Sequence, residues 1–122
     1  MSSKHILVFA ADSSVRQTKK LILESLGFNV IAVGSLREVE FVTSRSGFDL
    51  LILSRMLSTE NKRQASVTFR QKMIGAPILE ICDYKPCVDD PDYVLVGSRP
   101  EDLADKVREI FPDSRKITSK QF

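Results

Sequence analysis

A serine stands at the end of the most apolar short stretch of the chain. Residues 50–53, Leu-Leu-Ile-Leu, lead directly into Ser54 and Arg55. A short apolar run without alternating polar residues is typical of a strand buried on both faces, as in the centre of a parallel α/β sheet. Ligands and reactive groups gather at the carboxyl edge of such a sheet, so an active residue would be expected at Ser54.

No general base accompanies Ser54 in the sequence. A serine hydroxyl needs a neighbouring base or a metal ion before it becomes a useful nucleophile. The chain has a single histidine, His5, which lies well outside this stretch. We therefore expect Ser54 to close the end of its strand with a local hydrogen bond, and we expect the chain not to be an enzyme.

Two other stretches hold residue types that bind metals or anions. Cys82 and Cys87 are separated by four residues, but a structural zinc site needs four ligands. We expect two reduced thiols in or beside the core, and no metal or other cofactor. Asp12-Ser13-Ser14 could cap a helix, or could hold an anion at the helix N-terminus, although no glycine-rich phosphate loop supports the second role.

Length and composition limit the class of protein. The 122 residues make one domain by size, and 43% apolar and 28% charged residues are ordinary for a globular protein. No apolar run reaches the roughly 20 residues that span a bilayer. The apolar run at residues 6–9 is too short for a signal peptide. We expect a cytoplasmic protein with no membrane partner.

The small positive charge is concentrated at the C-terminus. The net charge is +2, and residues 113–122 alone contain three basic residues and one aspartate, which is also +2. The rest of the chain is therefore near neutral, whereas a nucleic-acid-binding domain normally carries a basic face. We expect residues 1–112 to form the domain and residues 113–122 to be a flexible basic tail, without a nucleic-acid partner.

Strands and helices are expected to alternate along the chain. Apolar and β-branched runs predict strands at residues 6–9, 29–33, 48–53, 78–82 and 93–96. Capping and stop signals predict helices at about residues 13–26, 36–46, 61–74 and 100–111. The first helix would bury Val15, Leu21, Ile22 and Leu26. Right-handed crossovers would place helices on both faces of a five-stranded, parallel, doubly wound, flavodoxin-like sheet.

Taken together, these segments resemble a known family. Residues 6–9, 23–30, 48–53, 76–79, 92–95 and 100–103 follow the order and spacing of the receiver domain of two-component response regulators. The likeness covers about residues 4–111, nearly the whole chain. It implies the receiver fold and a role in two-component signal transduction or a phosphorelay.

The residues that carry the chemistry of that family are replaced. In the family an aspartate after the third strand accepts a phosphoryl group, and two acids after the first strand hold Mg²⁺. A hydroxyl after the fourth strand and a lysine after the fifth bind the phosphoryl oxygens. These positions fall on Ser54, on Ala10 and Ala11 with Asp12 adjacent, on Cys82 and on Val96. The resemblance therefore implies a degenerate, or pseudo-receiver, site without phosphorylation.

The resemblance also implies a protein-binding side. The family has a helix between the fourth and fifth strands, but residues 83–91 contain two prolines, so we expect it shortened or missing. In the predicted strand, the Glu80 side chain points to the face opposite Leu79 and Ile81. We expect this to be the sheet face that the missing helix would leave exposed, and the alternative is a Glu80 that is paired inside the core. In the family this side makes dimer and output contacts, which implies a signalling-protein partner or a homodimer at Glu80, Tyr84, Tyr93 and Leu95.

Two functions of different classes follow. The first is a phosphorylation-independent protein-interaction module of two-component-type signalling. The second is a small-ligand or anion-binding α/β protein that uses the loops after the first and third strands.

Overall fold

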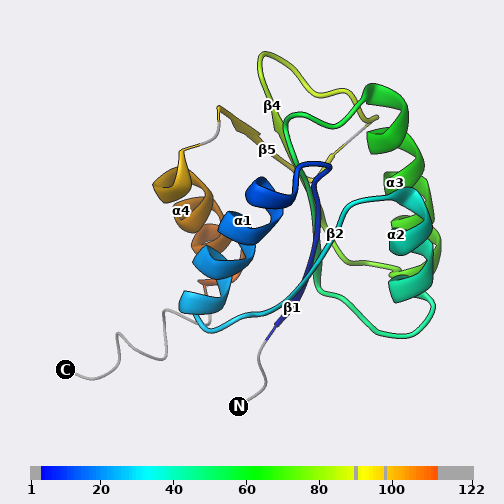
Figure 1. The fold of residues 1–122 in the computed structure, drawn as a ribbon, viewed down its shortest axis with the longest axis horizontal. Helices are drawn as coiled ribbons and strands as arrows, with labels where there is room; N and C mark the ends of the chain where they lie inside the picture. Colours follow the sequence, from blue (N-terminus) through cyan, green and yellow to red (C-terminus); the bar gives the residue numbers. More distant parts are fainter. Residues whose placement is uncertain (1–3, 90, 98, 113–122) are drawn as a thin grey trace.

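Strands and helices alternate through the described part of the chain (Figure 1). The structure is a computed structural model, and it describes residues 4–89, 91–97 and 99–112. Within these ranges the elements are β1 (His5–Phe9), α1 (Ser13–Ser25), β2 (Asn29–Val33), α2 (Leu36–Thr43), β3 (Leu50–Leu53), α3 (Thr59–Lys72), β4 (Ile78–Cys82), β5 (Tyr93–Val96) and α4 (Pro100–Ile110). The predicted tail at residues 113–122 lies outside them.

The five strands form one parallel sheet in the order β2-β1-β3-β4-β5. This arrangement confirms the predicted flavodoxin-like sheet. Its central strand, β3, is buried along its whole length, as the unbroken apolar run at residues 50–53 predicted. Because all strands are parallel, the residues that follow β1, β3 and β4 lie along one edge of the sheet.

Each face of the sheet packs against two helices. Helices α1 and α4 cover one face and α2 and α3 cover the other (Figure 1); we call these the α1–α4 face and the α2–α3 face. Alternation along the strands assigns the side chains. The α1–α4 face carries Ile6, Val8, Leu50, Ile52, Leu79 and Ile81. The α2–α3 face carries Leu7, Phe9, Leu51, Leu53 and Ile78.

The helix termini follow the local signals in most places. Asp12 caps α1, and Gly27 adopts a φ of 97° just beyond its end, a left-handed conformation that favours glycine. Helix α2 begins at its predicted cap, Ser35, but ends at Thr43, before the predicted residue 46. The Thr43 hydroxyl donates to the Val39 carbonyl of the last turn, so a local hydrogen bond competes with helix continuation.

None of the helices in the described ranges is long and apolar enough to cross a membrane.

The buried residues of α1 are Lys19 and Leu23, while Leu21, which the sequence assigned to the core, is exposed. The correct stripe runs through Val15, Lys19 and Leu23 at a spacing of four residues. Because the charged Lys19 occupies one position of this stripe, the apolar residues alone did not indicate the buried face of α1.

The chain between β4 and β5 forms no helix in the residues described there, 83–89 and 91–92. The predicted loss of a helix is therefore confirmed. The predicted exposure of the sheet is only partly correct, because β4 is completely buried, whereas β5 is partly exposed along its length. Val88 of the loop is buried against the α2–α3 face and takes part of the place of a helix.

Candidate functional site

The carboxyl edge of the sheet brings together several residues that the sequence singled out. The Ser54 N–H donates to the Phe9 carbonyl at 3.0 Å, and the Ala10 N–H donates to the Val33 carbonyl at 3.0 Å. These bonds extend the sheet past the ends of β3 and β1. Ser54 and Ala10 are both buried at this edge, and Cys82 ends the neighbouring strand β4.

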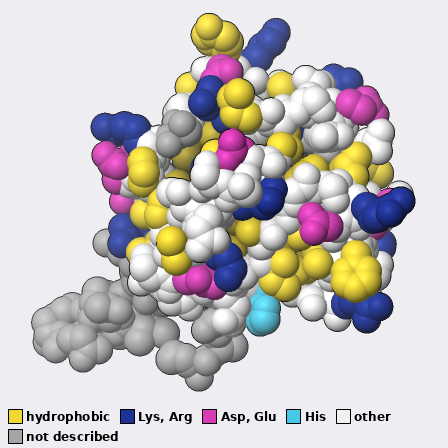
Figure 2. Space-filling model, in the orientation of Figure 1, with side chains coloured by type: hydrophobic (Ala, Val, Ile, Leu, Met, Phe, Trp, Pro, Cys, Tyr) yellow, Lys and Arg dark blue, Asp and Glu magenta, His cyan; other side chains and the backbone are white. Residues whose placement is uncertain are grey.

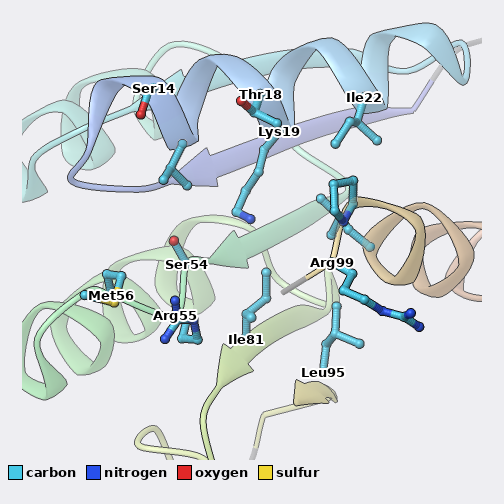
Figure 3. Close-up of a pocket in the computed structure, with 13 residues that line it drawn as sticks. Ser14, Thr18, Lys19, Ile22, Ser54, Arg55, Met56, Ile81, Leu95 and Arg99 are labelled. Carbon is cyan, nitrogen blue, oxygen red and sulfur yellow. The ribbon is translucent and has the colours of Figure 1, made fainter. Parts of the chain in front are cut away.

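Ser54 continues the alternation of Leu50 and Ile52, so its side chain lies on the α1–α4 face. Its backbone carbonyl accepts a hydrogen bond from the Leu57 N–H at 3.3 Å. The Ser54 hydroxyl makes no hydrogen bond with another described residue, so the local hydrogen bond found at this strand end is the one between backbone groups. In Figure 3 the hydroxyl points toward the space below α1.

Asp12 serves as the cap of α1. Its Oδ1 accepts hydrogen bonds from the Ser14 N–H at 2.8 Å, the Val15 N–H at 3.2 Å and the Ser14 hydroxyl at 2.6 Å. The Ser14 hydroxyl contributes most to lowering the pKa of this carboxyl below its usual value, and the two backbone N–H groups add to it. The carboxylate is thus committed to the helix terminus.

A guanidinium group lies in the loop after β1. Arg16 Nη1 donates to the carbonyls of Ala10 and Ala11, both at 2.9 Å. The same group packs so closely over Gly34 that a side chain at residue 34 would displace it. The positively charged Arg16 side chain of α1 therefore lies at the end of β1, where the receiver family has acidic residues.

These residues do not fit a magnesium ion. Mg²⁺ requires a near-octahedral set of oxygen ligands and is usually held through one or two carboxylates. The loop after β1 offers one carboxylate, Asp12, and the Arg16 guanidinium would repel a divalent cation there. In the described ranges no three His, Cys, Asp or Glu side chains are grouped so that they could hold a metal ion.

The remaining positions of the implied phosphoryl site are also without charge. Cys82 is buried, and this burial is the main cause that raises the pKa of its thiol, so the thiol stays neutral. Cys82 and Cys87 are both free thiols, as expected. Val96, at the end of β5, is 57% exposed and offers only an apolar side chain.

Glu80 is buried, which corrects the expectation that it is exposed. Its side chain is 0% exposed, and Lys62 of α3 donates to its Oε2 at 3.0 Å. The loop after β4 completes the arrangement, because the Cys87 N–H donates to Oε2 at 2.7 Å and the Val88 N–H to Oε1 at 3.2 Å. The alternative, a Glu80 paired inside the core, is therefore correct.

The four residues of the predicted interaction surface do not form one surface. Tyr93 and Leu95 pair in register with Leu79 and Ile81, so their side chains lie on the α1–α4 face. Glu80 lies buried on the opposite face. Tyr84 is 92% exposed on the loop after β4. The prediction overlooked that parallel register places neighbouring residues of β4 and β5 on the same face.

Two buried lysines were missed by the sequence reading. Lys62 lies on α3 at the same spacing as the buried Ala65, Ser66 and Phe69, and it neutralises Glu80. Lys19 lies in the buried stripe of α1 and lines a cavity of about 200 Å³ between α1, α4 and the ends of β3, β4 and β5 (Figure 3). The sequence did contain a signal for both residues, because each lysine stands three or four residues from the buried residues of its helix, where an apolar side chain is expected.

Comparison with known proteins identifies the fold. The sequence matches no protein-family profile and no curated protein. The structure is similar to the chemotaxis response regulator CheY4 of Vibrio cholerae, with a TM-score of 0.77, 17% identity, and coverage of 89% of this chain and 99% of that chain.

Two further solved structures give the same result. A receiver domain protein from Methanospirillum hungatei has a TM-score of 0.73, 21% identity, and coverage of 94% of this chain and 98% of that chain. The receiver domain of a sensor histidine kinase from Pseudomonas aeruginosa, solved with a magnesium ion in its active-site cleft, has a TM-score of 0.69 and 16% identity. The match covers 88% of this chain and 97% of that chain. The chain has the CheY-like fold of response-regulator receiver domains.

Proposed function

We propose that the chain is a phosphorylation-independent protein-interaction module of two-component-type signalling, which acts in the cytoplasm without catalysis. The observation that supports this most is the set of side chains at the ends of β1 and β3. Ala10, Ala11 and Ser54 stand where the receiver family has acids, and the Arg16 guanidinium contacts the first two. A phosphoryl group transferred there would lack both an acceptor carboxylate and a metal to neutralise it.

The test is exposure of the intact protein to acetyl phosphate and Mg²⁺, followed by mass spectrometry under denaturing conditions. We expect the unmodified mass, because a serine hydroxyl without a base or metal is a poor nucleophile. A stoichiometric phosphoryl adduct that disappears in Ser54→Ala would contradict the proposal. Denaturation removes any phosphate that is bound without a covalent bond.

The protein partner, or a second copy of the chain, is proposed to bind at the side of β5. This strand is an edge of the sheet, its apolar residue Val96 is exposed, and the aromatic Tyr84 is exposed on the loop after β4. Nucleic acid is not proposed as a partner. Figure 2 shows Lys and Arg side chains interspersed with Asp and Glu over the face in view, without a continuous basic patch among the described residues there.

A pair of matched variants tests this surface. Val96 on β5 and Val67 on α3 are both 57% exposed. We expect Val96→Lys to weaken association measured by co-purification from the native cell or by self-association, because it places a charge in an apolar contact. Val67→Lys should leave association unchanged. Equal association of both variants and the wild type would show that this edge is not the interface.

One observation, a cavity lined by Lys19, supports the small-ligand function that the sequence left open. The cavity beside Lys19 lies between α1 and α4, and its lining includes Ser14 at the start of α1 and Arg55 and Met56 after β3, so it adjoins the loops that the sequence suggested.

A further inference from the structure

A cavity opens at the carboxyl edge of the α1–α4 face. It has a volume of about 200 Å³ and lies between α1, α4 and the ends of β3, β4 and β5 (Figure 3). Most of its wall is apolar, formed by side chains that include Val15, Ile22, Ile81, Leu95 and Leu103. The residues of the implied phosphoryl site other than Ser54 do not line it. The cavity therefore adjoins that site and shares only Ser54 with it.

Lys19 places a positive charge in this apolar space. Its side chain is 8% exposed and extends from α1 into the gap above β3 (Figure 3). Among the described residues no carboxylate lines the cavity, and Lys19 forms neither an ion pair nor a hydrogen bond with any of them. Burial lowers the pKa of the Lys19 ammonium, and the neighbouring Arg55 adds a repulsion. A charge held in this way is costly to the fold.

The two arginines at the mouth of the cavity each pair with a carboxylate. Arg55 Nη1 lies 2.9 Å from Asp83 Oδ1. Arg99 makes a bidentate contact with Asp102, with distances of 2.9 and 3.0 Å, and its guanidinium points away from the cavity in Figure 3. The uncompensated charge inside the cavity is therefore that of Lys19.

A hydroxyl group faces the same space. Ser54 lies below Lys19, and in Figure 3 its oxygen points toward the gap that Lys19 enters. An ammonium and a hydroxyl that converge without a protein acceptor form a donor pair suited to an oxyanion. The apolar wall beside them would accommodate the uncharged part of the same ligand.

We propose that this cavity binds a small organic anion. Its carboxylate or phosphate group would pair with the Lys19 ammonium and accept a hydrogen bond from Ser54, and its compact apolar part would pack against Ile22 and Leu103. The volume lies below the roughly 300–1,000 Å³ of typical drug-sized sites, which favours a ligand smaller than a nucleotide. The inference goes beyond the proposed function and does not depend on it, because no covalent step is involved.

The experiment is a titration of the ¹⁵N-labelled protein followed by amide NMR shifts. The probes are inorganic phosphate, n-butyl phosphate and pentanoate, with n-pentanol as the uncharged control. We expect saturable shifts at residues around the cavity with butyl phosphate or pentanoate, and weaker binding of inorganic phosphate and pentanol. The comparison of the phosphate with the carboxylate identifies the preferred head group.

Matched lysine variants test the role of Lys19. Lys19→Met keeps most of the length of the side chain and removes its charge, and we expect it to weaken binding about tenfold or more. Lys20→Met is the control, since Lys20 pairs with Glu24 on the same helix at 3.1 Å and does not line the cavity. Ser54→Ala should weaken binding about two- to tenfold and serves if Lys19→Met alters the fold.

Three results would overturn the inference. The first is the absence of saturable shifts with every anionic probe. The second is an unchanged affinity in both Lys19→Met and Ser54→Ala. The third is an equal loss in Lys19→Met and Lys20→Met, which would indicate only a general attraction of anions to basic side chains. A phosphoryl adduct at Ser54 would contradict the proposed function without affecting this result.

Discussion

Two lysines, one on each face of the sheet, occupy core positions of their helices but differ in what surrounds them. Lys62 of α3 is 1% exposed and donates to the Glu80 carboxylate at 3.0 Å and to the Ile81 carbonyl at 2.9 Å. Lys19 of α1 faces a cavity to which the described part of the chain contributes no carboxylate. The same residue type is part of the core on one face and borders a cavity on the other.

The difference shows how to separate a structural buried charge from a functional one. The pair of Lys62 and Glu80 also orders the loop after β4, because Glu80 accepts the N–H groups of Cys87 and Val88. It thereby closes a face that has no helix between β4 and β5. Lys19 gives the fold no comparable contact, and a residue that breaks a local rule without a structural gain is expected at a functional site.

The largest effect is expected from breaking the buried pair. Lys62→Met should lower the free energy of unfolding by about 3–5 kcal/mol, because Glu80 would remain buried without its counter-charge. Chemical denaturation measures this change. The double variant Lys62→Met/Glu80→Gln removes both buried charges and keeps a carbonyl oxygen for one of the two loop N–H groups, so it should regain part of the loss. A single variant as stable as the wild type would show that the pair does not stabilise this face.

The same substitution on the other face should have the opposite sign. Lys19→Met replaces an uncompensated buried charge by an apolar side chain of similar length, so we expect a gain of about 0.5–2 kcal/mol in the free energy of unfolding. Lys20→Met, on the exposed side of α1, should stay within about 0.5 kcal/mol of the wild type. A loss of stability in Lys19→Met would mean that Lys19 is structural, as Lys62 is.

A smaller effect concerns pH. The pKa of Lys19 is lowered in the folded state from an ordinary value of 10.5, mainly by burial and further by the neighbouring Arg55. Below the folded pKa both states are protonated, and the full cost of burying the charge is present. Between the folded and unfolded pKa values only the unfolded state holds the proton, so wild-type stability rises relative to Lys19→Met. Denaturation of both proteins from neutral pH toward pH 10.5 measures this difference. If the stability difference between Lys19→Met and the wild type stays constant or widens as the pH rises, Lys19 does not carry an uncompensated buried charge.

Much of the fold could be predicted because its signals are local. The apolar run at residues 50–53 identified the central strand, and Asp12 and Ser35 marked the starts of α1 and α2. The prolines between residues 83 and 91 correctly predicted that no helix joins β4 to β5 in the part that the structure describes. Each of these signals acts within a few residues of the feature that it determines.

The site was harder to predict because its contacts join distant parts of the chain. Glu80 was expected in solvent because its partner, Lys62, is on another element, and sequence spacing does not show that pairing. Lys19 interrupted the apolar period of α1 and shifted the predicted stripe to Leu21. The face of the sheet on which the Tyr93 side chain lies depends on the pairing of Tyr93 in β5 with Leu79 in β4. Only the assembled sheet determines these relations.

The central claim is that a receiver fold is present without the metal-dependent switch. A titration with Mg²⁺, followed by amide NMR shifts of the intact protein at constant ionic strength, tests it most directly. We predict no saturable shifts at Ala10, Asp12 or Ser54, because a guanidinium and a committed capping carboxylate occupy the loop after β1. Saturable, localised shifts at these three residues would contradict the account.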